Sequence, residues 1–277
     1  MDTMKKIPLD PQRAARLLTD FIRETVTAAD FSKVVLGVSG GVDSALSLFL
    51  SAEALGPENV LALWLPYETS SEESRSYAQK VMEMNGVQSK TFSITEAVQG
   101  VLADLPDADR VRKGNVMARM RMIYIYDQAK AFGGLVVGTG NKTEILLGYS
   151  TLHGDGAFDL NPLGDLYKSQ VWALAEHVGV PQEIIDRPPS AGLWVGQTDE
   201  EELGFTYQEV DQLLYLLVEE GQTVEECVQA GISETFIREV IGRVKRYRFK
   251  RTLPPLGSIG QQPLSALDHR PVFTDDE

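Results

Sequence analysis

Patterns typical of strands and helices alternate through the first half of the chain. Residues 11–28 carry apolar side chains at helical spacing, and a second helix is predicted over 42–55. Between them, residues 33–38 (Lys-Val-Val-Leu-Gly-Val) form a short, apolar and partly β-branched run that predicts a buried strand. The alternation continues, with strands predicted at residues 60–65, 89–94 and 135–137 and helices at 71–84 and 114–132.

This alternation predicts a doubly wound α/β fold. Strand-helix-strand units of this length form right-handed crossovers in a mostly parallel sheet with helices on both faces. Beyond residue 144 the pattern is mostly helical, with helices predicted near residues 168–178, 206–219, 223–230 and 234–248. We therefore expect one domain over residues 1–277, with a helical C-terminal part and a mobile tail at 256–277.

Polar and glycine-rich segments follow the predicted strands. The first is the loop after Val38, the second is the Pro66-Tyr67 corner, and the third is residues 138–144 (Gly-Thr-Gly-Asn-Lys-Thr-Glu). Ligands of open α/β sheets bind outside the carboxyl ends of the strands. We therefore expect these segments to converge on one site.

The loop at residues 39–44, Ser-Gly-Gly-Val-Asp-Ser, has the composition of a phosphate site. Glycines let the backbone approach a phosphate chain closely, and the N–H groups at a helix N-terminus favour its negative charge. Asp43 would repel phosphate unless a divalent cation lay between them. We therefore assign Asp43 to Mg²⁺, which typically takes one or two carboxylates alongside phosphate oxygens.

Two other interpretations fit the residues of this loop. Residues 37–41 also match G-x-S-x-G, the nucleophile elbow of α/β-hydrolases, and Asp268 and His269 follow in the right chain order. Against a hydrolase, the elbow would stand on the first strand, and the sequence contains no oxyanion-loop motif such as His-Gly-Gly-Gly. The third interpretation is a tight helix–strand junction, but adjacent glycines followed by Asp and Ser are unusual for packing alone.

Charge restricts the partners that the chain can have. A net charge of −14 argues against a general nucleic-acid binder, because counterion release needs a broad basic surface. Basic residues nevertheless gather in one C-terminal segment: Arg238, Arg243, Lys245, Arg246, Arg248, Lys250 and Arg251. Two interpretations stay open, a solvated helix face whose last turn favours cations and a contact with an anionic ligand or another subunit.

Cysteine content and hydropathy bear on localisation. Cys227 is the single cysteine, so one chain can form neither a disulfide nor a multi-cysteine metal site. No stretch reaches the roughly 20 apolar residues that span a membrane. We expect a cytoplasmic protein that is neither secreted nor inserted into a membrane.

The motif Ser-Gly-Gly-x-Asp-Ser after the first strand resembles the signature of the N-type ATP pyrophosphatases. Residues 138–144 and 154–168, with support from 118–122 and 250–254, are similar to the NAD synthetase pattern within that superfamily. The resemblance covers residues 13–255. It implies an adenine nucleotide alpha hydrolase-like fold without a glutaminase domain.

By this resemblance the chain is an ammonia-dependent NAD synthetase, a ligase that forms a C–N bond. ATP would adenylate the carboxylate of nicotinic acid adenine dinucleotide (deamido-NAD) and release pyrophosphate, after which ammonia would displace AMP. The resemblance also implies a homodimer with the dinucleotide bound near the subunit interface.

The resemblance also assigns roles to individual residues. It implies that Asp43 and Lys168 are catalytic, that Asp43 and Glu144 bind Mg²⁺, and that Arg119, Asp159 and Lys250 contact the dinucleotide. The ATP-binding residues would be Gly37, Val38, Ser39, Gly40, Gly41, Val42, Asp43, Ser44, Thr139, Lys168 and Ser190.

Simpler interpretations of these residues remain. Glu144 could be a helix N-terminal carboxylate, Thr139 and Ser190 could be cap or turn residues, and Lys168 could lie on a helix surface. The chain also departs from the bacterial pattern. Leu152 and His153 stand where Lys-Tyr is common, and Phe249 stands where His is common. Residues 197–204 resemble a mobile acidic loop, or form a charged run in which Thr198 caps a helix.

Overall fold

Four parallel strands form the sheet of the computed structural model, which describes residues 7–194 and 196–257. The strands are β1 (Val34–Gly37), β2 (Val60–Trp64), β3 (Gln88–Thr91) and β4 (Leu135–Val136), in the order β3-β2-β1-β4. Val34 of β1 lies opposite Val60 of β2 and Leu135 of β4. The predicted strands are confirmed, although β3 ends at Thr91 and not at residue 94.

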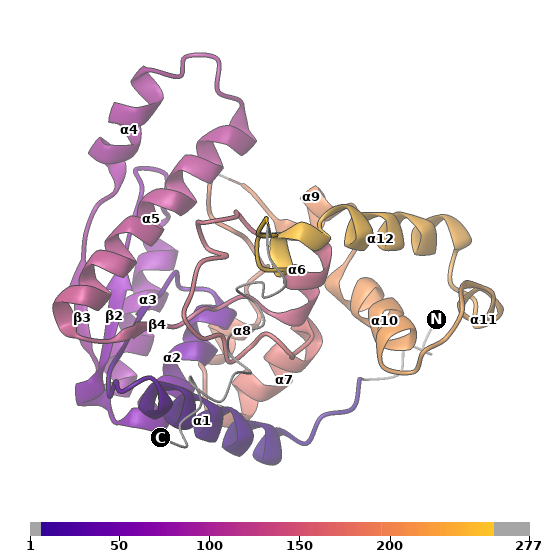
Figure 1. Ribbon diagram of the computed structural model, residues 1–277, viewed down its shortest axis with the longest axis horizontal. Coiled ribbons are helices and arrows are strands. Elements are labelled where there is room, and N and C mark those ends of the chain that lie inside the picture. Colours follow the sequence, from indigo (N-terminus) through magenta and orange to yellow (C-terminus); the bar gives the residue numbers. More distant parts are fainter. Residues whose placement is uncertain (1–6, 195, 258–277) are drawn as a thin grey trace.

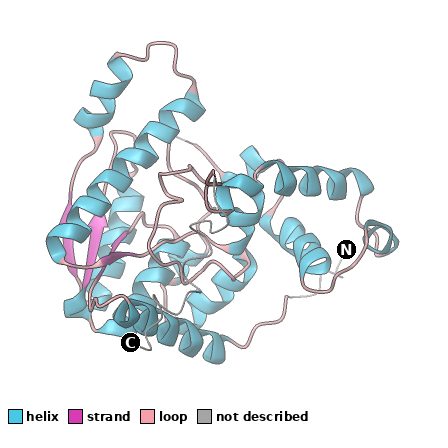
Figure 2. Ribbon diagram, in the orientation of Figure 1, coloured by secondary structure: helices cyan, strands magenta, loops and turns pink. Residues whose placement is uncertain are grey.

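Helices cover both faces of this sheet (Figures 1 and 2). Successive strand residues point to opposite faces, so Val34 and Leu36 join one core while Val35 joins the other. The first core includes residues of α1 (Pro11–Ala28), α2 (Val42–Leu55), α3 (Glu72–Asn85), α7 (Lys168–Val178) and α8 (Gln182–Ile185), and the second includes residues of α4 (Thr95–Ala103) and α5 (Arg110–Phe132). The predicted doubly wound α/β fold is confirmed.

Capping side chains explain where several helices begin. A helix leaves its first N–H groups without internal partners, and Asp or Ser side chains satisfy them. Asp10 accepts from the N–H of Arg13 at 3.0 Å at the start of α1. Asp109 accepts from the N–H of Arg112 at 2.8 Å, so α5 begins at Arg110 and not at the predicted residue 114.

The C-terminal part of the described chain is helical, as predicted, and has its own core. It consists of α9 (Asp199–Leu203), α10 (Tyr207–Val218), α11 (Val224–Gln229), α12 (Glu234–Arg246) and the 3₁₀ turn η2 (Arg248–Arg251), packed beside α6 (Lys142–Leu147). In Figure 1 these helices lie to the right of the sheet. Cys227 is fully buried in this core, which fits a structural role.

The site-forming end of the sheet lies between β1 and β4. The chain runs from β1 outward to β2 and β3 on one side and reaches β4 on the other, which makes this pair the switch point where such folds bind ligands. The short helices α6 and α8 were not predicted, because six and four residues are too few to display a helical period. No helix among the described residues is both long and apolar enough to cross a membrane.

Candidate active site

A cavity of about 1140 Å³ opens at the carboxyl end of β1 and β4. Its walls come from the loop after β1, the start of α6, one face of α5, residues 148–158, residues 187–194 and 196–202, and the segment from α12 to η2. Most predicted site residues line it: Gly37, Val38, Ser39, Gly41, Val42, Asp43, Ser44, Thr139, Glu144, Lys168, Ser190 and Lys250. Gly40, Arg119 and Asp159 do not belong to this lining.

The loop between β1 and α2 is folded around its serine hydroxyls. Ser44 Oγ accepts from the N–H of Ser39 at 3.1 Å, and Ser39 Oγ accepts from the N–H of Gly41 at 3.3 Å. Gly40 has φ +83°, and a Cβ there would lie 2.4 Å from the carbonyl oxygen of Ser74. Only glycine fits this turn without strain.

The N-terminus of α2 faces the cavity and has no side-chain cap. Its N–H groups and helix dipole therefore remain available for an anion. The hydroxyl of Ser39 lies 3.1 Å from that of Ser44. A hydrolase would need a histidine beside Ser39, but the candidates Asp268 and His269 lie outside the described residues.

Lys168 occupies the centre of a charged cluster at the base of the cavity. Its ammonium donates to Asp43 Oδ2 and lies 3.9 Å from Glu144 Oε1. Only 1% of Lys168 is exposed, so the alternative of a helix-surface lysine is wrong. Burial acts to lower the pKa of Lys168, but the charges of Asp43 and Glu144 offset burial and raise it.

Glu144 makes contacts with both of its carboxylate oxygens. Its Oε2 accepts from the N–H of Asn141 at 3.1 Å in a capping box at the start of α6, which agrees with the helix-terminus interpretation. Its Oε1 is the atom that faces Lys168. Burial, with a further contribution from the negative charge of Asp43, raises the pKa of Glu144 to about 8.

Asp43 and Glu144 fit the ligands of a magnesium ion. Both carboxylates face one positive charge, the ammonium of Lys168. Both also line the cavity beside the loop at residues 39–44, which we call the phosphate-type loop. The described part of the chain holds no cluster of three or more His, Cys, Asp or Glu side chains that could bind a metal. A pair suffices for Mg²⁺, because this ion commonly takes its other ligands from phosphate oxygens and water.

Asn141 connects the two predicted halves of the site and was not singled out from the sequence. It is fully buried, and its Nδ2 donates to Asp43 Oδ1 at 2.9 Å. Its own Oδ1 accepts from the N–H of Glu144 at 3.0 Å. The sequence signal was the pairing of Asn with Glu three positions later, which is a capping box.

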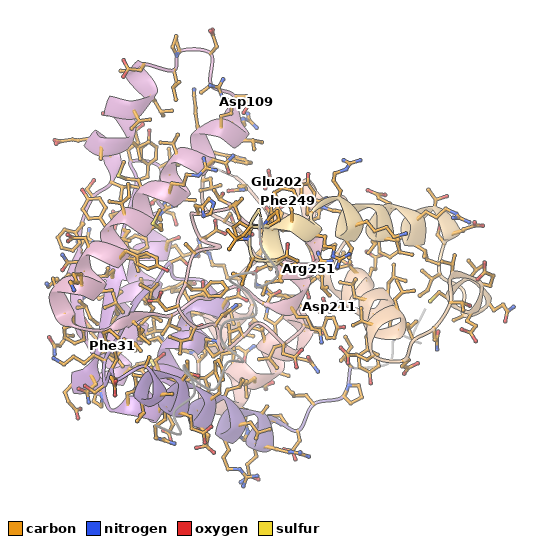
Figure 3. The ribbon with its side chains drawn as sticks, viewed as in Figure 1. Phe31, Asp109, Glu202, Asp211, Phe249 and Arg251 are labelled. Carbon is orange, nitrogen blue, oxygen red and sulfur yellow. The ribbon has the colours of Figure 1, made fainter. Side chains whose placement is uncertain are left out.

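Further hydrogen bonds fix α6 against the neighbouring helices. Thr143 donates its hydroxyl to Asp211 Oδ1, and Thr143 Oγ1 accepts from the N–H of Lys168 at 3.1 Å. Asp211, on α10, also accepts from the N–H of Ser169 at 2.7 Å (Figure 3). The backbone that carries Glu144 is therefore tied to the backbone that carries Lys168.

Residues 187–194 and 196–204 cover part of the cavity and are anchored at Asp199. This buried carboxylate accepts from the hydroxyls of Tyr149 and Tyr207, each at 3.1 Å, and from the N–H of Ala191 at 3.0 Å. Thr198 caps α9, as its charged-run interpretation predicted. The position of Ser190 on this segment depends on the Asp199 anchor.

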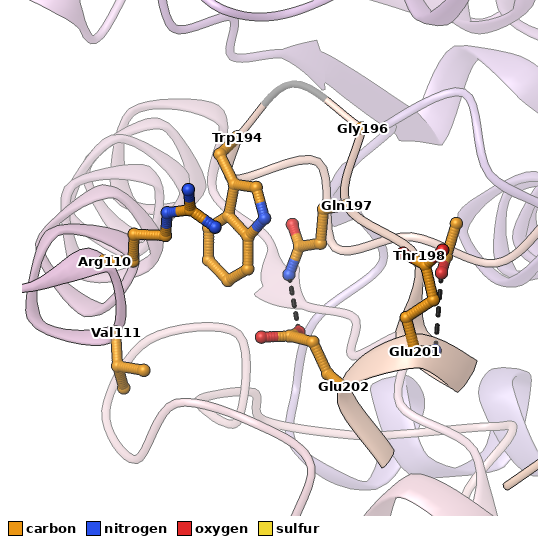
Figure 4. Close-up of a pocket in the computed structure, with 8 residues that line it drawn as sticks. All are labelled: Arg110, Val111, Trp194, Gly196, Gln197, Thr198, Glu201 and Glu202. Atoms are coloured by element: carbon orange, nitrogen blue, oxygen red, sulfur yellow. Dashed lines mark hydrogen bonds between the residues drawn. The ribbon is translucent and has the colours of Figure 1, made fainter. Parts of the chain in front are cut away.

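A smaller pocket of about 380 Å³ lies at the outer edge of this segment (Figure 4). The guanidinium of Arg110 lies 6.0 Å from the ring centroid of Trp194, and Gln197 donates to Glu202 at 2.8 Å. Val111 and Trp194 also line the large cavity. The pocket is therefore a side branch of the same site.

Arg187 is a second residue that the sequence did not single out. Its guanidinium donates to Ser74 Oγ at 2.7 Å and to the carbonyl oxygen of Gly40 at 3.4 Å, and its Nε lies 3.3 Å from Glu73. Arg187 lines the cavity. It places a positive charge against the phosphate-type loop, although no motif marks it in the sequence.

Of the three residues predicted to contact the dinucleotide, one lines the cavity and two do not. Lys250 lines the cavity, where its ammonium donates to the carbonyl oxygens of Gly148 at 2.8 Å and Ser150 at 2.6 Å. Asp159 lies outside the lining, where its Oδ2 accepts from the N–H of Val136 at 2.7 Å. Arg119 is exposed and donates to the carbonyl oxygen of Leu152 at 3.3 Å.

Arg121 is the arginine of α5 that lines the cavity. Its Nε donates to the carbonyl oxygen of Leu65 at 3.1 Å. Burial lowers the pKa of this guanidinium to about 10, and the negative charge of Asp155 partly offsets the effect. Arg119 and Arg121 point differently, because residues two apart do not share a helix face.

The three departures from the bacterial pattern fall outside the cavity of a single chain. Leu152 and His153 belong to the segment around Gly154, but neither lines the cavity. Phe249 is 58% exposed on η2 (Figure 3). A substitution at these positions does not alter the cavity lining of the described chain directly.

Known proteins resemble the chain over nearly its whole length. The family model described as NAD synthase matches residues 14–254. The NH(3)-dependent NAD(+) synthetase of Trichlorobacter lovleyi is 49% identical over 92% of this chain and 94% of its own.

Solved structures show the same fold. The NH3-dependent NAD synthetase of Campylobacter jejuni has 30% identity and a TM-score of 0.77 over 91% of this chain and 100% of its own. The NMN synthetase of Francisella tularensis has 34% identity and a TM-score of 0.81, with the same coverage of both chains.

Proposed function

The chain belongs to the NH3-dependent NAD(+) synthetase family, and we propose that it uses ATP to join ammonia to the carboxylate of deamido-NAD. One observation carries the chemical part of this proposal. Asp43, Glu144 and Lys168 meet beside an uncapped helix N-terminus in one cavity. This combination suits the transfer of a nucleotidyl group, in which negative charge must be held and redistributed.

In the first step a carboxylate oxygen of the dinucleotide forms a bond to the α-phosphorus of ATP, and the bond between that phosphorus and the bridging oxygen breaks. The N–H groups of the loop at 39–44 and the hydroxyls of Ser39 and Ser44 hold the phosphates. Lys168 offsets the negative charge that grows on departing pyrophosphate.

Asp43 and Glu144 would hold a Mg²⁺ ion, which would neutralise phosphate charge and so help one anion to approach another. Asn141 keeps the two carboxylates in place through its bonds to Asp43 and to the backbone of Glu144.

In the second step ammonia adds to the activated carbonyl carbon, a proton is lost, and the bond to the AMP oxygen breaks to leave the amide. Water would compete with ammonia for the same carbon, so the site must limit access of water. The residues at 187–194 and 196–204, anchored by Asp199, are placed to do so.

We also propose that two chains complete each other's dinucleotide site. Arg119 is exposed and does not belong to the cavity lining of its own chain. An exposed arginine beside the cavity mouth can contact a dinucleotide bound in the cavity of a neighbouring chain. A dimer would therefore be required for full activity.

The test is to incubate the pure protein with ATP, Mg²⁺, deamido-NAD and ammonium. AMP, pyrophosphate and NAD are expected in equal amounts. ADP and phosphate, or an absence of NAD, would contradict the proposal. In a parallel reaction with glutamine in place of ammonium we expect no NAD, because the nitrogen donor is free ammonia.

A further inference from the structure

The cavity contains cations that form no ion pair within the described chain. Lys168 is paired with Asp43, and Arg187 is paired with Glu73. In contrast, Arg243 and Lys250 line the cavity with no carboxylate within 4.0 Å among the described side chains. Uncompensated charge beside a cavity favours an anionic ligand.

Arg243 lines the cavity and also contains an unsatisfied donor. Its Nε is buried and has no hydrogen-bond partner within the described chain. A buried polar group without a partner costs free energy, and Arg243 is unlike its basic neighbours in this respect. Arg238 is paired with Glu234, and Arg251 donates to the carbonyl oxygens of Leu146 and Val244.

Arg243, Tyr247 and Lys250 occupy one side of the segment from α12 to η2, and all three line the cavity. Lys250 lies 4.9 Å above the ring of Tyr247. Burial lowers the pKa of Lys250; the negative charge of Asp155 opposes this effect, and the positive charge of Arg243 adds to it, which indicates that the two cations lie close together. Arg243 and Tyr247 are four residues apart in the sequence, and Tyr247 and Lys250 are three apart. This spacing places side chains on the same face of a helix.

The segment is held tightly against the C-terminal end of α6. Gly148 has φ +64°, and a Cβ there would lie 2.2 Å from Cβ of Tyr247, so only glycine permits this approach. Lys250 donates to the carbonyl oxygens of Gly148 and Ser150. These contacts hold Tyr247 and Lys250 against the end of α6, on the side of the segment that also carries Arg243.

Helix α6 separates this wall from the proposed ATP site. Glu144, beside Lys168, stands in its first turn, and Gly148 follows its last residue. Four residues correspond to about 6 Å along a helix axis. The cationic wall is therefore displaced from the reacting phosphates but belongs to the same cavity.

We propose that Arg243, together with Lys250, binds the bridging diphosphate of the dinucleotide substrate. This inference rests on the proposed function. The diphosphate carries two negative charges and matches two cations, and it is joined through a ribose to the nicotinate whose carboxylate must reach the α-phosphate of ATP. A guanidinium also presents several donors in a plane, which suits phosphate oxygens.

The test compares Arg243→Ala and Arg243→Lys with the wild type in the full chain. We expect Arg243→Ala to raise both the KM and the Kd for deamido-NAD about 10- to 100-fold, as for the loss of a hydrogen bond between charged groups. The KM for ATP should stay within about twofold of the wild type. Arg243→Lys should recover part of the loss, because it keeps the charge.

Arg246→Ala is the matched control, because Arg246 is exposed on the same helix and does not line the cavity. The inference would be overturned if Arg243→Ala left the Kd for deamido-NAD unchanged. It would also be overturned if Arg246→Ala raised this Kd equally, or if Arg243→Ala raised chiefly the KM for ATP. Thermal unfolding of each variant monitors the fold. If the wild type made no NAD, the proposed function would fail and the inference with it, whereas an active wild type with an unaffected Arg243→Ala variant would overturn the inference alone.

Discussion

Asn141 donates its side-chain amide to Asp43 across 98 positions of sequence and joins the loop after β1 to the segment after β4. The same residue caps α6 by accepting from the N–H of Glu144. One buried amide therefore sets the relative positions of both proposed magnesium ligands. The position of either carboxylate relative to the other cannot be deduced from the strand that precedes it.

Replacement of Asn141 should lower both stability and activity. Asn141→Ala removes a helix cap, which costs about 1–2 kcal/mol, and also releases Asp43. We expect a lower melting temperature together with weaker magnesium dependence and a reduced kcat. Thr223→Ala is the control, because Thr223 caps α11 in a capping box and does not line the cavity. It should lose stability with unchanged kinetics, and equal kinetic losses in both variants would contradict the positioning role.

Asp43→Asn should abolish adenylation while the fold stays intact. The change preserves the shape of the side chain but removes the negative charge that would bind Mg²⁺. Pyrophosphate release and circular dichroism check the two halves of this expectation. Asp165→Asn is a suitable control, since the side chain of Asp165 is 91% exposed and pairs with Lys142. Turnover like that of the wild type in Asp43→Asn would remove the magnesium assignment.

The raised pKa of Glu144 predicts how stability of the metal-free protein changes with pH. Its folded-state pKa of about 8 exceeds the ordinary value of 4.5, so folding favours the protonated carboxyl. The stabilisation from this group is fully present below pH 4.5 and is lost as pH rises towards 8. Glu144→Gln should remove this component of the pH dependence, because Gln can still complete a capping box. Melting curves of both proteins between pH 5 and 8.5 provide the measurement.

The same group should make magnesium binding depend on pH. Binding requires the ionised carboxylate, so affinity should rise between pH 6 and about 8 and a proton should be released. Calorimetry in buffers of different ionisation enthalpy would detect that proton. A magnesium affinity that stays constant over this range would contradict the assignment of Glu144 as a ligand.

Lys168→Ala should depress kcat by about 100-fold or more, as for the loss of one group that stabilises transition-state charge. The proposed reason is that its ammonium offsets charge growing on pyrophosphate. Lys80→Ala serves as the control, because Lys80 forms an ion pair with Glu183 on the surface. An increase in the KM for ATP with unchanged kcat would indicate that Lys168 contributes to ground-state binding only.

Arg119→Ala should raise the KM for deamido-NAD, with a loss of about 1.5–3 kcal/mol if it forms a hydrogen bond between charged groups. Mixing tests whether the contact crosses a dimer. A heterodimer of Arg119→Ala and Asp43→Asn would contain one site with both residues intact, provided that Arg119 acts on the neighbouring chain. Recovery of activity on mixing is expected, and its absence in a confirmed heterodimer would place Arg119 within its own site.

The expected tail at residues 256–277 begins within the described chain only at Leu256 and Gly257, and the rest lies outside it. In the described part, helix positions followed from apolar periodicity over long segments such as Pro11–Ala28 and Lys168–Val178, whose bounds agree with the structure. Short helices did not, because α6 has only six residues and is defined by its caps.

The sequence by itself determined the strand-helix alternation and the phosphate-type loop, because both depend on neighbours within a few residues. Tertiary structure alone decided that Lys168 is buried between Asp43 and Glu144, that Asn141 links them, and that Arg121 lines the cavity where Arg119 does not. These relationships join residues far apart in the chain. They arise only when parallel strands bring the ends of β1 and β4 together, which no local pattern records.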